Sequence, residues 1–101
     1  MNQEFHECSD GLEAVRSYEL FRPDWVLMDI KMPGMDGLAA AKNIIRDFPG
    51  ARIIFVTNFD DHDLRDAARR TGARGYVLKE RLFELEELMQ KEPQQSKEDL
   101  T

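Results

Sequence analysis

The sequence has 101 residues, which is enough for one small domain with a single modest core. Its net charge of −6 argues against binding to nucleic-acid phosphates or to an anionic membrane surface. Cys8 is the one cysteine in the sequence, so an internal disulfide and a four-cysteine zinc site are excluded.

The beginning of the sequence lacks the basic start and apolar run of a signal peptide. No apolar stretch approaches the roughly 20 residues that a membrane-spanning helix needs. We therefore expect a cytoplasmic protein without a membrane partner.

Four short segments rich in apolar residues predict strands. In chain order they are Phe5–Cys8, Trp25–Met28, residues 53–56 and residues 76–78. The second and third are apolar without interruption, which is typical of strands that are buried on both faces of a parallel sheet.

Amphipathic segments that predict helices follow each strand. The first begins near Asp10, which has capping-box spacing with Glu13, and its apolar stripe ends at Phe21. The second covers residues 38–48, the third lies between residues 61 and 72, and the fourth covers residues 82–89. This alternation predicts an open α/β sheet, with a domain at residues 1–90 and a tail or linker at residues 91–101.

Polar side chains stand where three of the predicted strands end: Asp29, Thr57 and Lys79. Ligands bind at this edge of open parallel sheets. An acid can act as a nucleophile there, a hydroxyl can donate a hydrogen bond, and an ammonium group can balance the charge of a phosphoryl oxygen. We therefore expect an anion-handling site, and we interpret Arg65, Arg69 and Arg70 as a solvated helical face.

Three motifs in the same order carry a resemblance to a known family. The stretches "PDWVLMDIKMPGMDG", "ARIIFVTN" and "GARGYVLKE" resemble the receiver domain of two-component response regulators. The segment "DLRDAARRTGARGYVLKE" is most similar to receivers of the branch that has a LuxR-type output domain. The resemblance covers the chain from about Phe5 to Met89.

The resemblance implies a flavodoxin-like, doubly wound parallel sheet that acts in phosphorelay signalling. Asp29 would accept a phosphoryl group from a sensor histidine kinase, and Thr57 and Lys79 would contact that group. Asp29 and the backbone carbonyl of Lys31 would be ligands of Mg²⁺. Thr57 and Tyr76 would form a conformational switch, in which Thr57 moves toward the phosphoryl group and the Tyr76 side chain turns inward. The domain would be a phosphoacceptor rather than an enzyme, with weak phosphotransfer or autodephosphorylation of its own.

The sequence departs from the family at its start. The family has a strand, a pair of acidic residues and a helix ahead of the segment that matches Phe5 onward. We therefore expect a truncated receiver that lacks the central first strand, binds Mg²⁺ weakly and is phosphorylated slowly. Residues 25–30 would form an unpaired apolar edge that favours self-association, unless the Phe5–Cys8 strand moves inward to pair with it.

Two other functions remain open. A haloacid-dehalogenase-type phosphatase also places an aspartate after an apolar strand, but it needs a second aspartate where this chain has Lys31. A phosphorylation-independent interaction module, or an inactive fragment of a longer response regulator, is the main alternative. In that case the surface around Tyr76 would bind a partner without any phosphorylation of Asp29.

Overall fold

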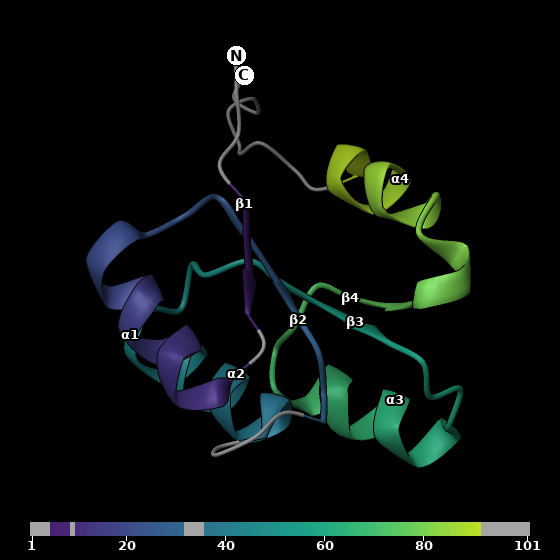
Figure 1. Cartoon of the computed structure of the whole chain (residues 1–101), viewed down its shortest axis with the longest axis horizontal. Coiled ribbons are helices and arrows are strands. Elements are labelled where there is room, and N and C mark those ends of the chain that lie inside the picture. Colours follow the sequence, from purple (N-terminus) through teal and green to yellow (C-terminus); the bar gives the residue numbers. More distant parts are fainter. Residues whose placement is uncertain (1–4, 9, 32–35, 92–101) are drawn as a thin grey trace, which may run out of the picture.

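The computed structural model describes residues 5–8, 10–31 and 36–91. Strands and helices alternate along the chain as the sequence predicts (Figure 1). The elements are β1 (Phe5–Cys8), α1 (Gly11–Phe21), β2 (Trp25–Met28), α2 (Gly37–Asp47), β3 (Ile53–Thr57), α3 (His62–Arg70), β4 (Gly75–Leu78), the 3₁₀ turn η1 (Lys79–Arg81) and α4 (Glu84–Lys91). The predicted tail lies outside the described residues apart from Lys91.

Aspartate caps define where the first three helices begin. The carboxylate of Asp10 accepts hydrogen bonds from the amides of Leu12 and Glu13, at 2.9 and 3.3 Å. Asp36 caps α2 and Asp61 caps α3 in the same way. Each cap satisfies amides that have no partner within the first helical turn. The caps therefore fix the points at which the chain leaves the strand ends and enters a helix.

The four strands form one parallel sheet in the order β1-β2-β3-β4. The apolar segment does not form an unpaired edge, because β1 pairs with β2 along its whole length, from Phe5 opposite Trp25 to Cys8 opposite Met28. An apolar strand keeps backbone donors and acceptors that need partners, and β1 supplies them. Of the two arrangements that the sequence allows, the chain adopts the inward pairing.

The two faces of the sheet are covered unequally. Figure 1 shows α1, α2 and α3 on one side of the sheet and α4 on the other. The larger core lies under the first three helices and includes Met28, Ile44 and Phe55, all fully buried. The smaller core joins Trp25, Ile54 and Val77 to half-buried side chains of α4. Both cores fix the strand ends on which the polar residues stand.

Candidate functional site

The structure brings Asp29 and Lys79 together at the carboxyl ends of the strands. Asp29 follows β2 and Lys79 follows β4, so the two residues approach each other across the end of β3. The ammonium group of Lys79 donates to the Asp29 carboxylate, with 3.0 Å between Nζ and Oδ2. The Asp29 side chain is 28% exposed and that of Lys79 is 45% exposed. A pair this accessible contributes at most about 1 kcal/mol, so another anion can share the ammonium group.

The backbone around Asp29 is held by the start of α2. The amide of Gly37 donates to the Ile30 carbonyl over 2.8 Å. The Lys31 amide approaches the other Asp29 carboxylate oxygen at 3.4 Å. A Cβ atom at position 37 would lie only 2.0 Å from the Asp29 carbonyl oxygen. Gly37 is therefore needed for the helix start to pack this closely, and the positive end of the helix dipole lies beside the acid.

Thr57 stands at the end of β3 and is fully buried. Its hydroxyl oxygen accepts a hydrogen bond from the Phe59 amide over 3.3 Å. Thr57 is thus hydrogen-bonded to the loop that follows β3, whereas Lys79 is hydrogen-bonded to Asp29. The hydroxyl keeps a proton that can be donated to another acceptor.

Tyr76 is joined to the same loop from β4. Its hydroxyl donates to the Phe59 carbonyl over 2.5 Å, so Phe59 bonds Thr57 through its amide and Tyr76 through its carbonyl. Burial raises the pKa of the Tyr76 phenol; the Arg65 cation opposes this rise, and the carboxylates of Asp61, Asp60 and Asp29 add to it. The predicted switch pair is therefore linked by a single residue.

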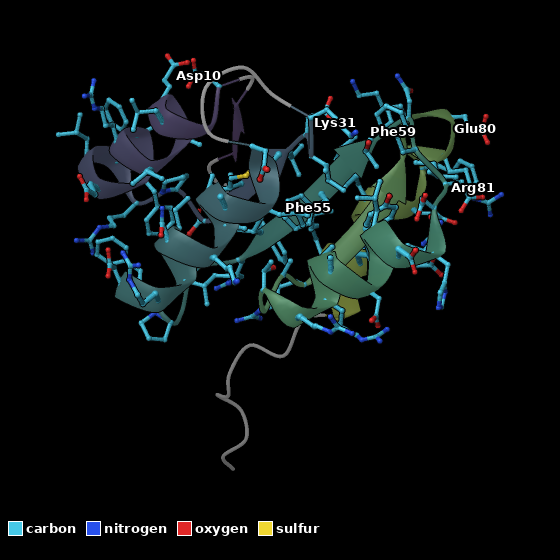
Figure 2. All side chains as sticks on the ribbon, turned by 90° about the horizontal axis from the view of Figure 1, so that it is seen from below. Asp10, Lys31, Phe55, Phe59, Glu80 and Arg81 are labelled. Atoms are coloured by element: carbon cyan, nitrogen blue, oxygen red, sulfur yellow. The ribbon has the colours of Figure 1, made fainter. Side chains whose placement is uncertain are left out.

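Two residues near the site carry no signal in the sequence. Phe59 is 45% exposed, and its ring centroid lies 5.2 Å from the Lys31 ammonium (Figure 2). The guanidinium of Arg65 lies over the Tyr76 ring, 4.6 Å from its centroid. The Arg65 side chain is 41% exposed, so it combines this ring contact with the solvated helical face that the sequence predicts. Its neighbours Arg69 and Arg70 share the Asp66 carboxylate on the exposed side of α3.

The residues that could hold Mg²⁺ are few. Within residues 10–31 and 36–90, whose side chains the structure describes, no three His, Cys, Asp or Glu side chains gather as a metal site would require. The oxygen donors expected from the sequence are the Asp29 carboxylate and the Lys31 carbonyl. Magnesium prefers octahedral oxygen ligation and often keeps several waters, and both of these groups are oxygen donors of the kind it prefers.

Comparison with known proteins places these features in a family context. The response regulator receiver domain family matches residues 1–91. The uncharacterized transcriptional regulatory protein YhcZ of Bacillus subtilis is 45% identical over 74 residues, which cover 73% of this chain and 35% of the relative. The oxygen regulatory protein NreC of Staphylococcus aureus is 42% identical over 73 residues, which cover 71% and 34%.

A solved structure shares both the fold and part of the sequence. It is a DNA-binding response regulator of the LuxR family from Staphylococcus aureus, with a TM-score of 0.74 and 36% identity. The match covers 81% of this chain and 69% of the solved one. The chain spans about a third of the length of the curated relatives. No helix in the described part of the chain is long and apolar enough to cross a membrane.

Proposed function

The chain belongs to the response regulator receiver domain family, and on that premise we propose that it accepts a phosphoryl group on Asp29 from a sensor histidine kinase. Receiver domains are signalling phosphoacceptors rather than ordinary enzymes, and they generally bind Mg²⁺ at the phosphorylation site. The observation that carries the proposal is the accessible Asp29 carboxylate, held 3.0 Å from the Lys79 ammonium at the strand ends. The proposed setting is the cytoplasm, without direct nucleic-acid contact.

The proposed reaction uses the residues at the strand ends in distinct roles. A carboxylate oxygen of Asp29 attacks the phosphorus of the kinase phosphohistidine; the new P–O bond forms as the P–N bond breaks, and the electron pair returns to the imidazole nitrogen. The Lys79 ammonium balances charge on the phosphoryl oxygens. The Thr57 hydroxyl, whose oxygen accepts from the Phe59 amide, donates its own proton to one of them.

The proposal includes a weak metal site in this chain. When it is bound, magnesium neutralises charge on the phosphoryl oxygens. The Asp29 carboxylate and the Lys31 carbonyl are the protein ligands proposed for it. With these two donors we expect weak binding and slow phosphorylation, because the attacking carboxylate approaches a dianion whose charge is poorly compensated.

A phosphodonor assay tests the proposal. We expect incubation with acetyl phosphate and Mg²⁺ to add one phosphoryl group slowly, measured by intact-protein mass spectrometry. Asp29→Asn should abolish the labelling because it removes the nucleophile. Lys79→Met should reduce the rate, because charge on the phosphoryl oxygens loses its partner.

Asp24→Asn is the matched control for this assay. It changes an aspartate at the opposite end of the same strand, just before Trp25, and should label as the wild type does. Labelling that persists in Asp29→Asn would contradict the assignment of the acceptor. Rapid labelling of the wild-type chain would contradict the proposal of a weak metal site but would not affect the assignment of Asp29 as the acceptor.

A phosphorylation-independent interaction module is the second candidate. What favours it is that the Tyr76 hydroxyl bonds the Phe59 carbonyl, so Tyr76 is held by a contact that does not involve Asp29. A pull-down of the partner kinase or output domain, with and without acetyl phosphate, separates the two functions. Binding that is the same with and without acetyl phosphate supports the interaction module, and binding that requires acetyl phosphate supports the phosphoacceptor function.

A further inference from the structure

Arg65 makes two contacts that point in different directions from α3. Its guanidinium lies over the face of the Tyr76 ring, 4.6 Å from the ring centroid. Its Nε and Nη2 atoms both lie 3.3 Å from one carboxylate oxygen of Asp60. Such a planar cation can stack on an aromatic face while its edge donates hydrogen bonds, which an ammonium group does less well.

These contacts join Tyr76 to the loop between β3 and α3. Asp60 directly follows Phe59, whose amide bonds Thr57 and whose carbonyl bonds Tyr76. Arg65 therefore holds the ring of Tyr76 and the loop on which that ring is anchored. A movement of Thr57 that shifts Phe59 also shifts Asp60, and with it the guanidinium over the ring.

A hollow beside the ring leaves one side of Tyr76 without close packing. A pocket of about 290 Å³ lies between α3 and β4, and both Arg65 and Tyr76 line it. Its other walls are the small residues Ala68, Ala73 and Gly75 and the long side chains of Arg69 and Arg74. Because this volume beside the ring is open, packing alone does not hold the ring against Phe59.

We infer that Arg65 is a positioning residue of the switch, which holds the Tyr76 ring where its hydroxyl reaches the Phe59 carbonyl and couples that ring to the loop of Thr57. Arg65 acts through Tyr76 and does not touch Asp29. The inference rests on the proposed function only in naming Tyr76 as part of a switch. The position of the ring can be tested without any phosphoryl transfer.

Arg65→Met tests the inference in the full chain, because it keeps the aliphatic stem and removes the cation. The readout is the pKa of the Tyr76 phenol, measured from the ring carbon signals in ¹³C-tyrosine NMR and assigned with Tyr76→Phe. If the ring swings away from Phe59 into solvent, it loses the burial that raises its pKa, and the pKa falls toward about 10. If the ring stays, loss of the cation raises the pKa further.

A fall in the pKa therefore supports the positioning role, whereas a rise or an unchanged value overturns it. Arg69→Met is the matched control, because Arg69 lines the same pocket but pairs with Asp66, and it should leave the pKa unchanged. Arg65→Lys keeps the charge and should restore part of the wild-type value. If Arg65→Met does not fold, Arg65→Gln carries the same test.

A second arm separates this inference from the proposed function. Arg65→Met should keep the labelling of Asp29 by acetyl phosphate, while the Tyr76 signals should no longer respond to that labelling. Wild-type-like response of Tyr76 in the variant would overturn the coupling. Failure of the wild type to label would contradict the proposed function and leave the result on ring position standing.

Discussion

At the scale of single residues, Gly37 is the position with the least freedom near Asp29. A Cβ atom there would lie 2.0 Å from the Asp29 carbonyl oxygen and 2.9 Å from the Ile30 Cα atom. Both neighbours are backbone atoms, so no flexible side chain can move aside. The residue thus couples the packing of α2 to the backbone that orients the Asp29 carboxylate.

We expect Gly37→Ala to destabilise the fold by about 1–3 kcal/mol or more, since the backbone must shift to admit the methyl group. The same shift should slow the labelling of Asp29. Urea unfolding and the acetyl phosphate assay measure the two effects. Gly50→Ala is the control, because a Cβ atom there has no neighbour within 4 Å and should change stability by less than about 1 kcal/mol. Equal stability of the two variants would contradict this account.

Residue patterns predict part of this site and miss the rest for a physical reason. The sequence predicts that Asp29 and Lys79 lie close together, because both follow buried strands and parallel strands end at one edge of the sheet. The contacts of Phe59 and Arg65 could not be predicted, because they depend on the path of the loop after β3 and on side chains that meet across it. Loop geometry of this kind has no periodic signal in a sequence.

At the scale of elements, the apolar runs predict the four strands and four α-helices that the structure describes, and aspartates cap the first three helices, whereas the 3₁₀ turn η1 is absent from the prediction. The neighbour of β2 could not be predicted, because a strand that is apolar on both faces accepts any parallel partner of matching length. The pairing of β1 with β2 depends on which strands are present, a property of the whole sheet rather than of either segment.

Helix α4 illustrates how one element supports one face of the sheet. A Cβ atom at Gly75 would lie 2.6 Å from Cδ1 of Leu88, so this leucine packs directly on the bare backbone of β4. It also packs on the smaller core formed by Trp25, Ile54 and Val77. Among the described residues, α4 is the one helix in that core, so its contacts have no substitute there.

We expect Leu88→Ala to lower the free energy of unfolding by about 1–3 kcal/mol, less than a fully buried leucine would cost because Leu88 is half-buried. Chemical denaturation measured by Trp25 fluorescence reports the change at the same core. Phe83→Ala is the control: this side chain is 72% exposed and should change stability by at most about 0.5 kcal/mol. A larger loss of unfolding free energy for Phe83→Ala than for Leu88→Ala would contradict the role of Leu88 in this core.

At the scale of the whole molecule, the sheet has two outer strands, β1 and β4, within the part that the structure describes. The expectation of self-association depended on β2 being one of them. Because β1 pairs along all of β2, the apolar strand is closed on both sides. We therefore expect the chain to be a monomer in solution. A second copy could add to the sheet at β2 only if β1 were no longer paired with it.

Two proline variants of β1 test this expectation. Backbone amides alternate in direction along a strand, so of His6→Pro and Glu7→Pro one removes an amide that faces β2 and the other removes an amide that faces outward. We expect the first to uncover β2, lower stability and shift sedimentation velocity toward a dimer. The second should remain monomeric, since an edge strand tolerates proline where its amide faces solvent. A wild-type dimer that neither proline disturbs would show that association uses another surface.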